Sequence, residues 1–289
     1  MEFLQPRTWA EALEAKAAHP DAVPIAGGTD VMVELNFDRH RPAALLDLTR
    51  VPELTEWAHE DGRIRIGAGV TYTRVIDELG ARLPGLALAS RTVGSPQIRN
   101  RGTVGGNLGA ASPAGDSHPP LLAAGAEVEV QSTRGTRRIP AADFYTGVKR
   151  NALEADELIA AVLMEPAAGP QQFSKIGTRN AMVIAVSAFA VALDPARRAV
   201  GTGIGSAAPT PRRAAEAERF VAGEIDAAGL WDSRQALPEG LAEEFARRVR
   251  EAADPIDDVR GTAAYRLHSL AVMARRTLTW AWDDYRKAA

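Results

Sequence analysis

The sequence TVGGNLGAASPAGD, residues 103–116, is unusual for a folded protein because almost every side chain in it is small. Glycine costs backbone entropy and adds no side chain to a hydrophobic core. A chain accepts this cost where the backbone bends sharply or where another molecule approaches the main chain. The stretch ends in a carboxylate, Asp116, which accepts hydrogen bonds and repels anions. We interpret the stretch as a loop that admits a ligand.

A shorter loop of the same kind precedes it, AGGTD at residues 26–30, between a predicted short strand and a predicted amphipathic segment. Successive backbone N–H groups in such turns form an anion nest, and small side chains let a phosphate reach them. Thr29, Thr103 and Asn107 add side-chain donors, whereas Asp116 suits the hydroxyls of a sugar or ribityl chain. Two such loops in one domain favour a dinucleotide; the alternative is two tight turns that bind nothing.

The dinucleotide motifs of the Rossmann fold do not match. GAGVTY at residues 67–72 has Tyr72 where the third glycine belongs, and no acidic residue lies about 20 residues further on. GTGIGSA at residues 201–207 leads into APTP rather than into a helix. The glycine-rich loops therefore predict a dinucleotide site of another architecture.

The composition is that of a globular chain. With 289 residues, 46% of them hydrophobic, the length suits two domains better than one. A net charge of −3 gives no electrostatic case for a nucleic acid or an anionic membrane as partner. No apolar run approaches the roughly 20 residues of a membrane span. The first residues lack the order of a signal peptide, so we expect a cytoplasmic protein.

Cysteine is absent from the sequence, and the five histidines are scattered without helical i, i+4 spacing. The chain therefore has no disulfide, no thiol nucleophile and no thiolate ligands for an iron–sulfur cluster, and a histidine-rich metal site is not expected. We predict that any redox role of this chain depends on an organic cofactor.

Hydrophobic patterns predict an α+β chain in two parts. Strands are expected within residues 21–35, 43–51, 63–71 and 155–166, a helix from Thr71 through Leu79, and a hairpin over residues 125–140 turning near Gly135. PAAGPQQ, residues 166–172, marks a seam, which we place near residue 168, so that the predicted domains are 1–168 and 169–289. A second sheet follows in residues 171–177, 183–193 and 199–208, and helices in 210–223, 238–253 and 261–288.

Several of these stretches, in this order, carry a family resemblance. PIAGGTDVMV, LLDLTRVPEL, IRIGAGVTYTRV, the long run from Gln97 to Val130, FSKIGTRNAM and GIGSAAPTPRRA resemble the FAD-binding subunit of the molybdenum hydroxylases. These are the xanthine dehydrogenase and carbon monoxide dehydrogenase enzymes. The similarity covers nearly the whole chain, and the long glycine motif is its most specific part.

The resemblance implies a PCMH-type FAD-binding domain of two subdomains, followed by a smaller α/β C-terminal domain with a three-stranded sheet and helices. It also implies that FAD is held non-covalently, with Asp116 on the sugar or ribityl hydroxyls. The other residues implied are Pro24, Ile25, Ala26, Gly27, Gly28, Thr29, Asp30 and Val31 around the pyrophosphate, Thr103, Gly106 and Asn107 at the phosphate and ribityl groups, and Val93, Ile159 and Lys175 along the flavin.

In the family that this chain resembles, the work is divided. A large subunit holds the molybdenum cofactor and oxidises the substrate, a small subunit holds two [2Fe–2S] clusters, and the assembly is a dimer of heterotrimers. The resemblance implies that this chain passes electrons from the clusters to an external acceptor. The absence of cysteine agrees with that division.

Two other functions remain open. A stand-alone PCMH flavin oxidase acting on a small alcohol or amine needs its own base over the flavin, for which the sequence offers no obvious candidate. A non-enzymatic binding or assembly protein has no need of intact glycine loops or of Asp116. The electron acceptor is also open. In the xanthine dehydrogenases that use NAD, a basic and then an acidic residue follow the lysine, whereas here Arg179 follows Lys175 and no acidic residue comes next. This leaves NAD in doubt, and oxygen, a quinone or a protein are the alternatives.

The remaining notable residues have simpler explanations. His118 is predicted to be a solvated loop histidine rather than an attachment point for flavin. Arg99 and Arg101 are predicted to be solvated, and Trp280 and Trp282 to be packing residues of the last helix. Lys175 lies within a predicted strand between apolar residues, where an unpaired ammonium is costly, so we expect it to have a partner.

Overall fold

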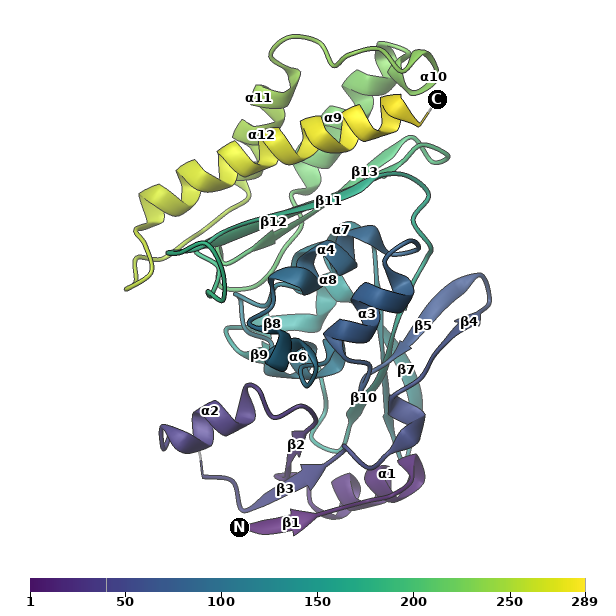
Figure 1. Cartoon of the computed structure of the whole chain (residues 1–289), viewed down its shortest axis with the longest axis vertical. Helices are drawn as coiled ribbons and strands as arrows, with labels where there is room; N and C mark the ends of the chain where they lie inside the picture. The colour runs from purple at the N-terminus through teal and green to yellow at the C-terminus, as the bar shows by residue number, and fades with distance from the viewer. Residues whose placement is uncertain (40, 289) are drawn as a thin grey trace.

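The computed structural model describes residues 1–39 and 41–288, and its elements form three successive parts from the N-terminus to the C-terminus (Figure 1). The first part is a small parallel sheet with the strand order β1-β3-β2. The central strand β3 is buried at every position, as expected for a strand with a neighbour on each side. The elements are β1 (Glu2–Leu4), α1 (Trp9–Ala18), β2 (Val23–Ile25), α2 (Val31–Asn36) and β3 (Ala44–Asp47).

The second part is a five-stranded antiparallel sheet with the order β4-β5-β10-β6-β7. Side chains alternate across strand β5: Ile64 and Ile66 are fully buried, whereas Arg65 points the other way and pairs with Glu129 of β6 at 2.7 Å. The strands are β4 (Trp57–Glu60), β5 (Arg63–Gly67), β6 (Glu127–Ser132), β7 (Gly135–Pro140) and β10 (Leu158–Met164), and a short pair, β8 (Tyr145–Gly147) with β9 (Arg150–Asn151), lies apart.

Short helices occupy the chain between β5 and β6, and most have a residue that fixes their first turn. Thr71 caps α3, Ser95 caps α5 and Thr103 caps α6 through side-chain oxygens, and α4 begins with Pro84. The helices between β5 and β6 are α3 (Tyr72–Leu79), α4 (Pro84–Thr92), α5 (Pro96–Arg99), α6 (Val104–Ala110) and α7 (His118–Ala123). Outside this stretch, η1 (Pro52–Leu54) precedes β4 and α8 (Ala141–Phe144) follows β7.

The third part is an antiparallel sheet of order β11-β12-β13. The long helix α12 lies along one face, and α4 and α7 of the preceding part lie against the other (Figure 1). The buried apolar residues of this part form one hydrophobic cluster within residues 189–285. Those of the first two parts form a second cluster within residues 12–164. The elements are β11 (Gln171–Ile176), β12 (Ser187–Asp194), β13 (Ala199–Gly205), α9 (Ala215–Ala227), α10 (Leu230–Ser233), α11 (Leu241–Glu251) and α12 (Ala263–Lys287).

The glycines of GTGIGSA have a packing role. A Cβ atom on Gly201 would lie 2.0 Å from the carbonyl oxygen of Ala123, and one on Gly203 would lie 2.0 Å from that of Pro119. Strand β13 therefore lies directly on the backbone of α7, which a side chain at either position would prevent. This contact joins the third part of the chain to the second.

The expected α+β architecture is confirmed, including the helix at Thr71, the hairpin near Gly135 and the three-stranded C-terminal sheet. One packing prediction was half wrong. Trp282 is buried, whereas Trp280 is 47% exposed. Residues two apart on a helix point to different sides, so α12 buries Trp282 against Trp231 of α10 and leaves Trp280 outside. Of the histidines, His40 lies outside the described residues.

Candidate functional site

The two glycine-rich loops lie against each other. A Cβ atom on Gly27 would lie 1.9 Å from the carbonyl oxygen of Arg101 and 2.9 Å from the nitrogen of Gly102. Gly28 has a φ of 78°, in the left-handed region that glycine adopts without strain. The first loop therefore depends on glycine to turn away from β2 and to rest on the segment that leads into the second loop.

The second loop leaves part of its main chain open. The hydroxyl oxygen of Thr103 accepts the backbone N–H of Gly106 at 2.9 Å, which fixes the first turn of α6. Gly105 packs tightly on Ala68, since a Cβ atom there would lie 2.5 Å from that of Ala68. On the other side, a Cβ on Gly106 would meet only the Thr103 hydroxyl at 3.0 Å. The small residues thus serve two purposes, packing on one side and access on the other.

Asn107 is held by its neighbours in a defined orientation. The Ser117 hydroxyl donates to Asn107 Oδ1 at 2.6 Å, and the Tyr72 hydroxyl lies 3.3 Å from the same Ser117 oxygen. Because the carboxamide oxygen is engaged in this way, the amide NH₂ of Asn107 is the group that can serve a ligand. Tyr72 and Ser117 are both buried, so this arrangement is built into the core.

Asp116 and Lys175 form a buried ion pair between the second and third parts of the chain. Lys175 Nζ lies 2.5 Å from Asp116 Oδ2 and also donates to the Thr92 carbonyl at 3.1 Å. The Thr92 hydroxyl lies 3.0 Å from Asp116 Oδ2 and 2.8 Å from the Ala89 carbonyl oxygen, and it shares its proton between these two acceptors. The two charged side chains are only 8% and 7% exposed. Burial raises the pKa of Asp116, and the Lys175 charge opposes that rise. Asp116 Oδ1 is buried and makes no hydrogen bond.

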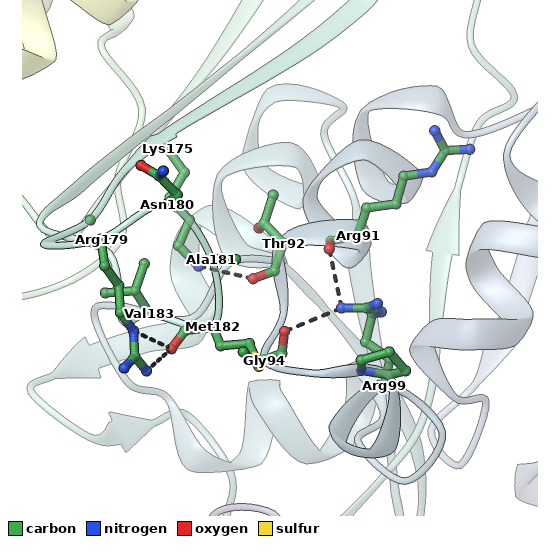
Figure 2. Close-up of a pocket in the computed structure, with 12 residues that line it drawn as sticks. Arg91, Thr92, Gly94, Arg99, Lys175, Arg179, Asn180, Ala181, Met182 and Val183 are labelled. Carbon is green, nitrogen blue, oxygen red and sulfur yellow. Dashed lines mark hydrogen bonds between the residues drawn. The ribbon is translucent and has the colours of Figure 1, made fainter.

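A pocket of about 450 Å³ opens beside this pair, between helices α4 and α5 and the segment after β11 (Figure 2). Four cationic side chains and no carboxylate are found among its lining residues. Arg99 was predicted to be solvated; it is half-buried and donates to the carbonyls of Val93 and Gly94, each at 3.2 Å. The lining residues are Arg91, Thr92, Gly94, Pro96, Arg99, Lys175, Gly177, Arg179, Asn180, Ala181, Met182 and Val183.

The other predicted site residues occupy different places around these features. Val93 follows the last residue of α4, next to the pocket lining, and Ile159 of β10 lies beneath α6, where its Cδ1 would be 3.9 Å from a Cβ on Gly109. Asp30 precedes α2 without capping it, and burial raises its pKa. The remaining residues of the first loop, Pro24, Ile25, Ala26, Thr29 and Val31, run from β2 into α2.

Sequence reasoning missed Thr92 and Ser117. Neither belongs to a motif, and each acquires its role only through partners brought close by the fold, Asp116 for Thr92 and Asn107 for Ser117. The one available signal is adjacency, since Ser117 directly follows the predicted Asp116.

The prediction for His118 was wrong. Its ring is fully buried at the start of α7, and Nδ1 lies 2.8 Å from the Tyr145 hydroxyl. Burial lowers the pKa of His118 to about 3, which keeps the ring neutral near pH 7. The residues around it suggest a loop, but they fold into a short helix packed between the C-terminal sheet and helices α4 and α8. Arg101, in contrast, is exposed as expected.

Within residues 1–39 and 41–288, no group of three or more histidine, aspartate or glutamate side chains could hold a metal ion. Across the same residues, no helix combines the length and apolar character needed to cross a membrane.

The site suits a ligand with an anionic part and a polar, extended part. Open main chain at the second loop offers a close approach, the Asn107 amide offers donors, and the unpartnered Asp116 Oδ1 is a buried acceptor that lacks a donor. The cationic pocket favours electron-rich groups. FAD, with a diphosphate, a ribityl chain and a flavin ring, fits this set of groups.

Comparisons with known proteins point to one family. Residues 1–164 match the FAD binding domain in molybdopterin dehydrogenase, and residues 172–281 match the CO dehydrogenase flavoprotein C-terminal domain. The nicotinate dehydrogenase FAD-subunit of Eubacterium barkeri is 37% identical over 68% of this chain and 70% of its own length. A putative xanthine dehydrogenase FAD-binding subunit of Escherichia coli is 32% identical over 94% of this chain and 92% of its own.

Solved structures agree. A chain of quinoline 2-oxidoreductase from Pseudomonas putida superposes with a TM-score of 0.89 and 26% identity, over 99% of this chain and 98% of that one. A chain of reconstituted CO dehydrogenase from Oligotropha carboxidovorans superposes with a TM-score of 0.88 and 27% identity, over 100% and 98%. The family resemblance seen in the sequence is confirmed. The chain belongs to the family of molybdopterin dehydrogenase flavoprotein subunits, in which this FAD-binding domain precedes a C-terminal domain of the CO dehydrogenase type.

Proposed function

We propose that this chain is the FAD-binding, electron-transferring subunit of a heteromeric molybdenum hydroxylase. The observation that carries the proposal is the junction of two glycine-rich loops beside a cationic pocket and a buried ion pair, in a chain without cysteine. FAD supplies the redox chemistry, taking electrons from [2Fe–2S] clusters on a small partner subunit and giving them to an external acceptor. A large partner subunit with the molybdenum cofactor oxidises the substrate.

The residues of this chain bind and orient the cofactor. We expect the loop from Pro24 to Val31 and the main chain at Gly106 to approach the phosphates. At Gly106 an added Cβ would have only the Thr103 hydroxyl as a neighbour. Asn107 donates from its amide, since Ser117 engages its oxygen. The remaining members of the site are Thr103 near the phosphates, Asp116 and Lys175 at the polar chain and ring, and Val93 and Ile159 as apolar lining.

The finer organisation is part of the same proposal. We place the boundary between the FAD-binding domain (1–168) and the C-terminal domain (169–289) in the segment before β11, where the two hydrophobic clusters part. Two further parts of the proposal are a dimer of heterotrimers as the assembly and the cytoplasm as its location. The relatives named as subunits of xanthine and nicotinate dehydrogenases support a multi-subunit complex.

A stand-alone oxidase is less well supported by the pocket. Such an enzyme needs a general base within reach of its substrate, and the ionisable groups among the lining residues are arginines and one lysine that is paired with Asp116. An electron-transfer subunit needs no such base, because the substrate reacts elsewhere. The acceptor stays open among NAD, oxygen, a quinone and a protein.

The deciding experiment is purification of the tagged chain from its native host, followed by metal analysis and a visible spectrum. The proposal expects two partner chains that carry molybdenum and iron. It also expects absorption at about 450 nm from flavin bound to this chain. It also expects the flavin to be reduced by substrate in the complex and not in the isolated chain. A yellow, metal-free chain that oxidises an alcohol or amine alone would establish the oxidase instead.

A further inference from the structure

The buried pair of Asp116 and Lys175 joins two parts of the chain at the edge of the pocket. Lys175 comes from β11 of the C-terminal sheet, and Asp116 comes from the turn before α7. Lys175 and Thr92 line the pocket, whereas Asp116 lies behind them. The cationic member of the pair therefore faces the ligand space, and the anionic member supports it.

The unused bonding capacity of the pair points toward a ligand. The Lys175 ammonium has three donors, and it uses two, on Asp116 Oδ2 and on the Thr92 carbonyl. Asp116 Oδ2 accepts from both Lys175 and Thr92, whereas Oδ1 is buried without a partner. One N–H group of Lys175 therefore remains for a molecule bound in the pocket, and Asp116 Oδ1 is left without a donor behind it.

We propose that Asp116 and Lys175 act in flavin binding as a single ionised unit, in which each is a positioning residue that keeps the other charged, with Thr92 holding both. This inference rests on the proposed function, because the ligand of the unit is FAD. The unit differs from two independent contacts, since neither residue retains its charge at this burial once the other is removed.

The two single substitutions should weaken FAD binding at opposite ends of the pH range. Without Asp116, a buried Lys175 favours its neutral form, so its charge is lost as the pH rises. Without Lys175, a buried Asp116 favours its neutral form, so its charge is lost as the pH falls. Burial already raises the pKa of Asp116 with the ammonium in place, which agrees in sign with the second case.

The neighbouring titratable groups do not interfere. Tyr72 of α3 faces Asp116, and burial raises its pKa, so it stays neutral at and above neutral pH. His118 of α7 has a pKa lowered to about 3 and stays neutral as well. Arg91 and Arg99 of the pocket, on α4 and α5, keep their charge at every usable pH. Asp116 and Lys175 are therefore the two groups on which these substitutions should act.

The test is the dissociation constant of FAD from the full-length chain, stripped of flavin and titrated by fluorescence between about pH 6 and 9. The unaltered chain should bind with little pH dependence. Asp116→Asn should bind more weakly as the pH rises and Lys175→Met as it falls, each by up to about tenfold per pH unit. The double variant Asp116→Asn/Lys175→Met should show weak binding without a slope.

Two controls separate this outcome from a general loss of structure. Asp116→Asn/Lys175→Arg should lose the slope of Asp116→Asn, because a guanidinium stays charged without a carboxylate. That comparison also serves if Lys175→Met does not fold. Glu129→Gln removes another buried carboxylate, paired with Arg65 away from the pocket, and should leave the FAD profile unchanged.

The coupled unit would be overturned if the FAD dissociation constants of both single variants did not change with pH. It would also be overturned if the losses of binding free energy in the two single variants added up to the loss in the double variant, because the two residues would then be separate contacts. Equal affinity of Lys175→Met and the unaltered chain would overturn it too, while FAD binding itself stands. A failure of the unaltered chain to bind FAD at any pH would instead refute the proposed function.

Discussion

Replacing Gly106 by valine tests whether the second loop admits a ligand. An added Cβ at this position would have one close neighbour, the Thr103 hydroxyl at 3.0 Å, which must move by a few tenths of an ångström. Valine is also no worse than glycine as a helix residue, so the stability of the fold should change by less than about 1 kcal/mol. The added side chain therefore acts on the ligand rather than on the protein.

The expected loss of FAD affinity follows from the space that the two methyl groups of the introduced valine occupy. Non-bonded carbon contacts settle near about 3.5 Å, whereas hydrogen bonds need donor–acceptor distances of about 2.7–3.2 Å. A ligand pushed off this surface loses its nearest polar contacts, and two charge-assisted bonds are together worth about 3 kcal/mol or more. Because about 1.4 kcal/mol corresponds to a factor of ten, Gly106→Val should weaken FAD binding by at least about 100-fold.

The assay is fluorescence titration of flavin-free protein with FAD, with thermal unfolding of the same samples. Gly223→Val is the matched control, since Gly223 lies in helix α9 and an added Cβ there would meet nothing within 4 Å. It should bind FAD like the unaltered chain. Normal FAD affinity in Gly106→Val, with a normal unfolding transition, would show that the loop is only a turn.

Three further substitutions test the site and its support. Gly27→Ala places a Cβ 1.9 Å from the Arg101 carbonyl, so urea unfolding should show a loss of about 1–3 kcal/mol, and an unchanged midpoint would contradict the contact. Asn107→Asp replaces the amide donor by an anion and should weaken FAD binding by at least about tenfold in titration, whereas equal affinity would remove Asn107 from the site. For His118 the folded pKa is about 3 against 6.5 unfolded, so stability is fully present above pH 6.5 and is lost as the pH falls, by about 2 kcal/mol at about pH 5. In His118→Gln the urea unfolding midpoint should no longer fall between about pH 7 and pH 5. An equal fall in both proteins would show that His118 is not the cause.

The glycine-rich loops could be predicted from sequence because their signal is local. A run of small residues such as 103–116 restricts what the backbone does whatever surrounds it, and the structure confirms a main chain left open at Gly106. The same applies to Thr71, whose capping role depends on the next few residues only, whereas the capping role of Thr103 was not predicted. The local patterns also predicted the stretches that contain β5, β6, β7, β10 and the three strands of the C-terminal sheet, whereas β1 and β4 were not predicted.

The partners across the fold could not be predicted in this way. A partner for Lys175 was expected from its apolar surroundings, but its identity, Asp116, depends on how two sheets dock. The burial of His118 depends on the same docking, because α7 is enclosed only once β13 lies on it. Trp280 has the residue type of a core position, and only the orientation of α12 decides that it faces outward.

The docking of the two sheets depends on the glycines of GTGIGSA, which match no dinucleotide-binding motif. Gly201 and Gly203 allow β13 to rest on the carbonyls of Ala123 and Pro119, and α7 begins just after Asp116. Lys175 stands on β11 of the same sheet, so this close approach determines whether its ammonium reaches the carboxylate. The GTGIGSA stretch therefore contributes to the candidate site without touching a ligand, because it sets the distance over which the ion pair forms.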